Sequence, residues 1–125
     1  MYRSLITLLV VLFSGYASAH EWTPTYPTMK PSHVQGVYYT DMNLFNGRQD
    51  VKYYEISVWD KDWGRIPFAA EIRVVPLEYL ARKQIRIYLR EEDLPAATYI
   101  CSLSKLEAEG DLKSAISSKI CSKIR

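Results

Sequence analysis

Apolar and polar residues alternate along much of this chain, and a period of two predicts short β-strands. The clearest runs are 51–59 and 84–90, where apolar side chains stand at alternate positions. Such a run places one face of a strand on a core and the other face in water. Three more strands are predicted at 34–45, 72–75 and 97–103.

The C-terminal segment 113–125 fits two periods. Ile116, Ile120 and Ile124 lie at i, i+4 and i+8, so they form either one stripe of a helix or one face of a strand. The repeated serines and isoleucines disfavour a helix, and a strand is therefore preferred. Together these segments give about seven short strands without helical crossovers, which predicts an all-β fold in the form of a single β-sandwich.

The N-terminus has the pattern of a secretory signal peptide. The positive charge of Arg3 precedes the apolar run 5–13, and the small residues Ala17-Ser18-Ala19 follow. The run is too short to span a bilayer, and no later segment approaches the roughly 18 apolar residues that a span requires. We therefore expect 1–19 to be a cleaved signal peptide, followed by a mature chain that starts at His20, has no membrane span and is periplasmic or secreted.

The mature residues suit one domain with an N-terminal extension. Pro24, Pro27 and Pro31 predict a proline-rich extended arm over 20–33, and the sandwich would then cover 34–125. The formal net charge of the whole chain is +2, and it falls to +1 when Arg3 is removed. A balance so close to zero gives no general attraction for nucleic acid, which is therefore not expected as a partner.

Cys101 and Cys121 are the two cysteines of the chain. In an exported protein, an even number of cysteines indicates a disulfide. Closing a loop of about 20 residues would stabilise the fold by roughly 3 kcal/mol in the chain-entropy model. The alternative, a metal or redox pair, lacks nearby histidines. A structural disulfide is therefore expected.

Two features resemble an immunoglobulin-type sandwich. Trp59 closes the central strand, and Ala97-x-Tyr99-x-Cys101 is similar to the tyrosine-corner segment of that fold. The resemblance implies a single immunoglobulin-like β-sandwich. A bridge from Cys101 to Cys121 would then link its last two strands.

The order of the segments also resembles the N-terminal domain of periplasmic pilus-assembly chaperones. The resemblance covers about residues 34–105 and rests on Leu44-Phe45-Asn46, Tyr54-x-Ile56-x-Val58-Trp59-Asp60, Pro67-Phe68, Ile72-Arg73-Val74-Val75-Pro76-Leu77 and Gln84-Ile85-Arg86-Ile87. In that family, a late strand with large hydrophobic side chains completes the fold of a pilin subunit. The resemblance implies a surface-assembly subunit as partner, bound by strand addition through Ile116, Ile120 and Ile124.

Copper binding at the mature N-terminus is the alternative function. His20 would offer an α-amine and an imidazole, an arrangement that resembles the brace of secreted copper proteins. Copper requires a further nitrogen ligand, and His33 is the other histidine of the chain. Apart from this copper, no cofactor is expected.

A basic strip is formed by Arg82, Lys83, Arg86 and Arg90, with Tyr79 and Tyr88 among them. Aromatic residues between basic ones are typical of single-strand nucleic-acid surfaces. Arginine and lysine are also ordinary outward residues of a sheet, where they discourage edge pairing. The second interpretation is preferred because the net charge is near zero.

Nothing in the chain identifies catalysis. Motifs for a nucleophile or a phosphate-binding loop do not occur, and the chain is not expected to be an enzyme. Trp22, Tyr26 and Trp63 could anchor a partner, because aromatic side chains are frequent interface hot spots. The leading prediction is a small exported β-sandwich that binds another protein, with Trp63 and the three C-terminal isoleucines as its partner-binding residues.

Overall fold

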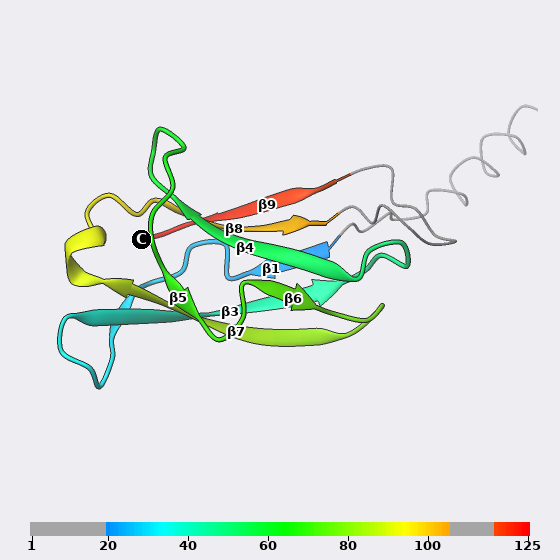
Figure 1. The fold of residues 1–125 in the computed structure, drawn as a ribbon, viewed down its shortest axis with the longest axis horizontal. Helices are drawn as coiled ribbons and strands as arrows, with labels where there is room; N and C mark the ends of the chain where they lie inside the picture. The colour runs from blue at the N-terminus through cyan, green and yellow to red at the C-terminus, as the bar shows by residue number, and fades with distance from the viewer. Residues whose placement is uncertain (1–19, 106–116) are drawn as a thin grey trace, which may run out of the picture.

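A computed structural model describes residues 20–105 and 117–125, which form an all-β fold (Figure 1). The strands among them are β1 (His20–Thr23), β2 (Lys30–Pro31), β3 (Val37–Asn46), β4 (Tyr53–Trp59), β5 (Ala69–Ala70), β6 (Val74–Pro76), β7 (Arg82–Arg90), β8 (Tyr99–Ser104) and β9 (Lys119–Lys123). One short 3₁₀ helix, Glu91–Asp93, follows β7. The predicted immunoglobulin-like β-sandwich is confirmed. It has more strands than the roughly seven expected. Two of them, β1 and β2, lie in the segment 20–33 that was predicted as an arm, and β2 and β5 are very short, with two residues each.

Two antiparallel sheets face each other. The five-stranded sheet has the order β1-β3-β7-β5, with β2 also paired to β3, and the four-stranded sheet has the order β6-β4-β8-β9. In Figure 1, β9, β8 and β4 lie above β3 and β7. The longest ladder joins β3 to β7, from Val37 opposite Arg90 to Phe45 opposite Arg82. Residues 37 to 53 positions apart in the sequence are thus fixed side by side in one register.

The core lies between the two sheets. It is filled by the side chains that the alternation marked as apolar, including Ile56 and Val58 of β4 and Ile85, Ile87 and Leu89 of β7. Burying each of these side chains is worth about 1.5–3 kcal/mol relative to exposure. The residues between them point outward, so each sheet has one face on the core and one outer face.

The segment 20–33 is extended, and the structure makes it part of the sandwich. Its first residues form β1, which pairs with β3 along its whole length. The next residues run beside β9, where the Lys123 amide donates to Thr25 O at 3.0 Å. In the same way, the Arg125 amide donates to Pro27 O at 2.9 Å. This segment therefore contacts both sheets and covers part of the outer edge of β9.

The C-terminal segment is a strand where the structure describes it. Lys119–Lys123 forms β9, antiparallel to β8, which confirms the preference for a strand over a helix. Cys101 and Cys121 face each other across this pair and form a disulfide, with a Cα–Cα distance of 4.1 Å. The expected bridge between the last two strands is therefore confirmed. Residues 113–116 of the predicted strand and the predicted signal peptide 1–19 lie outside the described residues.

Asn46 connects the end of β3 to the loops around it. Its side chain is fully buried. Nδ2 donates to Val51 O at 2.7 Å and to Leu77 O at 2.9 Å. Oδ1 accepts from the Arg48 amide at 2.9 Å and from the Tyr54 hydroxyl at 2.6 Å. All the hydrogen-bonding capacity of this amide is used, which is the arrangement that a buried polar group requires.

Candidate functional site

Three aromatic side chains meet on the outer face of the four-stranded sheet. Trp59 at the end of β4 and Tyr99 at the start of β8 are register partners, so their side chains leave the sheet on the same face. Trp63 comes from the loop after β4 and stacks on Tyr99, with ring centroids 4.7 Å apart and an interplanar angle of 7°. The Trp63 ring also meets the Trp59 ring edge-on, at 6.3 Å. We call Trp59, Trp63 and Tyr99 the aromatic cluster.

The loop that carries Trp63 is folded around one carboxylate. Asp60 Oδ1 accepts hydrogen bonds from the backbone N–H groups of Asp62 and Gly64, both at 2.8 Å. The Asp60 amide in turn donates to Gly64 O at 2.9 Å. A Cβ atom on Gly64 would lie 2.6 Å from Asp60 Oδ2, so the turn fits closely around a residue without a side chain. The loop therefore presents Trp63 in one position.

Trp63 combines a strained backbone with exposure to solvent. Its φ is 63°, a left-handed conformation that costs a non-glycine residue about 1–2 kcal/mol. The residue is nevertheless 51% exposed. Conformations of this kind persist only where the surroundings enforce them, and they concentrate at functional sites. Here the Asp60 turn and the stack on Tyr99 enforce the conformation.

Two cations lie over the rings of the aromatic cluster. Lys119 of β9 places its Nζ 4.3 Å from the centroid of the Trp59 ring and 4.8 Å from that of Trp63. The Arg65 guanidinium lies 4.8 Å from the Trp59 centroid. Cation–π contacts at exposed positions contribute about 0.5–1 kcal/mol each. The site is therefore an aromatic patch with positive charge on its rim.

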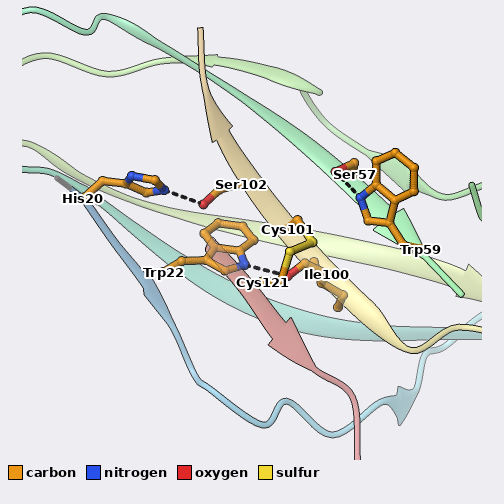
Figure 2. The surroundings of a disulfide bond; sticks show 8 residues. All are labelled: His20, Trp22, Ser57, Trp59, Ile100, Cys101, Ser102 and Cys121. Carbon is orange, nitrogen blue, oxygen red and sulfur yellow. Dashed lines mark hydrogen bonds between the residues drawn. A yellow bond between two sulfur atoms is a disulfide. The ribbon is translucent and has the colours of Figure 1, made fainter. Parts of the chain in front are cut away.

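The disulfide fixes the strand that carries Lys119. Figure 2 shows the bond joining β8 to β9, with Trp59 beside Ser57 on the neighbouring strand. The Trp59 Nε1 donates to Ser57 Oγ at 2.7 Å, and Ser57 is the register partner of Cys101. Cys101 has the outward parity of Tyr99 yet is fully buried, so side chains of the outer face cover it. The disulfide thus lies under the outer surface next to the aromatic cluster.

His20 is buried and hydrogen-bonded through both ring nitrogens. Its Nε2 lies 2.9 Å from Ser102 Oγ, the contact drawn in Figure 2, and its Nδ1 lies 3.1 Å from Ser118 Oγ. Its ring also packs against Tyr54, with centroids 4.8 Å apart. Burial lowers the pKa of His20, and the Arg48 charge lowers it further, against the opposite effect of the Ser102 hydrogen bond.

The structure does not bring the two candidate copper ligands together. His20 lies opposite Asn46, at the C-terminal end of β3, whereas His33 precedes Val37 at the other end of that strand. Ten residues of extended chain separate these ends, which corresponds to about 30 Å. Both nitrogens of the His20 imidazole are also already hydrogen-bonded to serine hydroxyls. Among the described residues, no three His, Cys, Asp or Glu side chains gather in a group that could hold a metal ion.

The buried imidazole predicts that stability depends on pH. Because the pKa of His20 is lowered in the folded state, the unfolded chain takes up a proton first as the pH falls below about 6.5. The stability that the neutral ring contributes is therefore complete above that pH and is lost progressively below it. We expect the urea midpoint to fall between pH 7.5 and pH 5 by more in the wild type than in His20→Gln. An equal fall in both proteins would contradict this.

The C-terminal isoleucines do not form an exposed surface where they are described. Ile120 and Ile124 are partly buried and pack against the core. The outward positions of β9 are instead Lys119, Cys121 and Lys123, as their pairing with outward residues of β8 shows. Ile116 lies outside the described residues. The hydrophobic side chains of this strand therefore stabilise the chain's own sandwich and are not available to complete another protein's fold.

The aromatic residues of the N-terminal segment have separate environments. Trp22 is buried in the core, and its Nε1 donates to Ile100 O at 3.0 Å, as Figure 2 shows. Tyr26 is 54% exposed, with the Arg125 guanidinium 5.2 Å from its ring centroid. Trp22 therefore holds β1 to the sandwich and cannot contact a partner. Of the three predicted aromatic anchors, Trp63 is the one that is both exposed and stacked on another ring.

The predicted basic strip lies on β7. Arg82, Arg86 and Arg90 are exposed on the outer face of the five-stranded sheet, and each has an acidic partner: Glu21 for Arg82, Asp41 for Arg86, and Glu92 and Asp93 for Arg90. The hydrogen bond from Arg86 lowers the pKa of the Asp41 carboxyl. Because these carboxylates balance their charges, the three arginines do not form a positive surface.

Sequence reasoning identified Trp63 but not the residues around it. Tyr99 was assigned to a tyrosine corner, whereas it lies on the outer face under Trp63. Lys119 and Arg65 received no role. The signal for Tyr99 was its place next to the apolar Ile100, because neighbouring residues of a strand lie on opposite faces. Nothing local connects Lys119 to Trp59, because the contact depends on how β4, β8 and β9 are ordered in the sheet.

Comparisons with known proteins add little beyond the fold. No family model matches the sequence, and the search of curated proteins found no match. Among solved structures, the chain is similar to the ASH/PapD-like domain of human CEP192 (PapD-like domain 7). The identity is 10%, the match covers 86% of this chain and 85% of that chain, and the TM-score is 0.49. A likeness of this size supports no inference about partners. Within residues 20–105 and 117–125, no helix has the length and apolar character that crossing a bilayer requires.

Proposed function

We propose that this chain is an exported protein-binding module that acts by contact, without catalysis, through the aromatic cluster. The observation that carries the proposal is Trp63, which is half exposed and is held in one geometry despite its backbone strain. Tryptophan and tyrosine dominate interface hot spots because they offer a large contact area. A side chain that is already fixed loses little conformational entropy when a partner binds.

A purely structural role does not account for Trp63. Glycine or asparagine would adopt its φ at lower cost, and either would close the loop around Asp60 equally well. The stack on Tyr99 stabilises the fold by about 0.5–1.5 kcal/mol, which only offsets the cost of the left-handed backbone at Trp63. The fold therefore gains little from a tryptophan at this position. A surface that contacts another molecule does gain from it.

The binding surface is a sheet face and not the C-terminal strand. Strand addition through Ile120 and Ile124 does not fit their inward orientation. In addition, the residues around Thr25 and Pro27 already cover part of the outer edge of β9. Export is supported by the signal-type sequence 1–19 and agrees with the disulfide, because disulfides persist in oxidising compartments. A subunit of a surface assembly is a partner that such a location would provide.

The test replaces Trp63 with glycine. Trp63→Gly removes the ring and relieves the strain, so the free energy of unfolding should change by no more than about 1 kcal/mol. The matched control is Leu80→Gly, because Leu80 has a φ of 64° and is 60% exposed in the loop between β6 and β7. Both variants and the wild type would serve as baits in the periplasmic fraction of the source cells, with quantitative mass spectrometry of the captured proteins.

We expect at least one protein to be captured by the wild type and by Leu80→Gly, and to be reduced about tenfold or more with Trp63→Gly, as loss of a hot-spot tryptophan predicts. Equal stability of the three baits, checked by thermal unfolding, is a condition of the comparison. If capture is the same with all three baits, or is lost only with Leu80→Gly, the aromatic cluster is not the binding site.

A further inference from the structure

The outer face of the four-stranded sheet is apolar well beyond Trp63. At the far end of the same face, Tyr53 of β4 is 44% exposed and Val74 of β6 is 43% exposed. Val74 is the register partner of Glu55, which pairs on its other side with Leu103. The strand register therefore places Tyr53, Val74 and Leu103 towards one end of this face, with Glu55 among them, and the aromatic cluster at the other end. The outward positions between the two groups are the buried residues Ser57 and Cys101.

The charged residues on the two outer faces differ in how they are paired. On the five-stranded sheet, each exposed arginine of β7 has a carboxylate partner. On the four-stranded sheet, Lys105 pairs with Glu55 at 3.0 Å. Within residues 20–105 and 117–125, no carboxylate forms a salt bridge with Lys119, Lys123 or Arg65, although all three are exposed. This face therefore carries unneutralised positive charge.

The nearby acidic residues leave this charge in place. Asp60 is directed to the backbone amides of its own loop, where it holds the turn. Asp62 is exposed at the tip of the same loop. Asp60 keeps its charge in this arrangement, so two carboxylates stand against the three cations Lys119, Lys123 and Arg65, and the balance beside the aromatic cluster remains positive.

From this charge pattern we infer the chemistry of the partner, on the basis of the function proposed above. The partner presents an acidic protein segment to this face. Its carboxylates meet Lys119, Lys123 and Arg65, and its apolar side chains cover Trp63 and the apolar residues towards Val74. Charge complementarity of this kind selects partners and speeds association, while the buried aromatic contacts supply most of the affinity.

A protein segment fits this face better than a densely charged polyanion. Besides the three cations, this face carries the Lys105–Glu55 ion pair and the carboxylate of Asp62, whereas the affinity for a nucleic acid depends on the number of phosphates that lysines and arginines neutralise. The exposed apolar residues Tyr53 and Val74 also have no counterpart in a polyanion. Aliphatic and aromatic side chains with carboxylates beside them match both features.

The test uses a random peptide library displayed on beads and screened against the full mature chain. Three variants are screened in parallel: Trp63→Gly, Lys119→Glu and, as the matched charge control, Lys83→Glu. Lys83 is exposed on β7 in the other sheet, so this control makes the same charge change away from the site. Heparin and polygalacturonate are titrated against the same four proteins by calorimetry.

We expect the wild type and Lys83→Glu to select peptides with a net negative charge and at least one apolar side chain. The affinity of a selected peptide should fall about tenfold or more with Trp63→Gly and with Lys119→Glu. Its binding should also weaken at high salt, because exposed charges are screened.

Each other result overturns the inference in a distinguishable way. Selection of neutral or basic peptides that depend on Trp63 refutes the acidic partner and leaves the protein-binding function intact. Acidic peptides that bind all four proteins equally refute the site. Binding of heparin or polygalacturonate that depends on Lys119, without peptide selection, makes the ligand an anionic polysaccharide. If nothing depends on Trp63, the proposed function fails together with the inference.

Discussion

Replacing Asn46 with alanine should lower the free energy of unfolding by about 3–5 kcal/mol, because several buried groups lose their partner at once. The amide of Asn46 holds two backbone carbonyls, those of Val51 and Leu77. It also accepts from the Arg48 amide and from the Tyr54 hydroxyl. A buried group left without a hydrogen bond costs about 1–3 kcal/mol, and water can reach only some of these sites after the substitution.

The hydroxyl of Tyr54 is the most severely affected group. Tyr54 is fully buried, and burial raises its pKa to about 12, so its proton stays in place and needs an acceptor at all ordinary pH values. Tyr54→Phe removes this donor and should cost only about 1–2 kcal/mol in the wild type. In the Asn46→Ala background the same change should cost much less, because the hydroxyl has already lost its acceptor.

The matched control is Asn43→Ala, which makes the same chemical change on the same strand. Asn43 is exposed on β3, and its replacement should alter stability by no more than about 0.5 kcal/mol. Urea unfolding followed by circular dichroism measures all five proteins, the wild type and the four variants. For a domain with a total stability of about 5–15 kcal/mol, the loss at Asn46 is a large fraction. A loss below about 1 kcal/mol for Asn46→Ala would show that the loops reorganise without their buried amide.

Removing the disulfide is the second change with a large expected effect. The double variant Cys101→Ala/Cys121→Ala should lose about 3 kcal/mol, because the sequence separation of 20 residues no longer restricts the unfolded chain. Dithiothreitol should lower the urea midpoint of the wild type to nearly that of the double variant. The same reagent should leave the double variant unchanged, which separates loss of the bond from other effects of the reductant.

Removing the disulfide should also disturb the geometry of the aromatic cluster. Cys121 lies two residues after Lys119, whose ammonium contacts Trp59 and Trp63. Without the bond, the pairing of β9 with β8 rests on hydrogen bonds and on Ile120 and Ile124 alone. We expect weaker binding of the selected peptides as well as lower stability. Native protein with two free thiols, detected by alkylation and intact-mass analysis, would contradict the structural role of the disulfide.

The alternation of the sequence was sufficient to predict most strands, because side-chain period is a local property of the backbone. Residues 84–90 are the best example, since their buried and exposed positions in β7 follow the pattern. β1 was not predicted as a strand, although His20 and Trp22 alternate with Glu21 and Thr23. The three prolines that follow favoured an extended arm instead, and the pairing with β3 depends on residues twenty or more positions away.

The sequence by itself determined the class of the fold and the sulfur bridge. A period of two needs only neighbouring residues, and two cysteines have one possible intramolecular pairing. The candidate site was decided by tertiary structure alone, apart from Trp63. Tyr99, Lys119 and Arg65 meet Trp59 and Trp63 because of the order β4-β8-β9 and the register within it. Strand order and register come from long-range packing, so no local pattern could have assembled this surface.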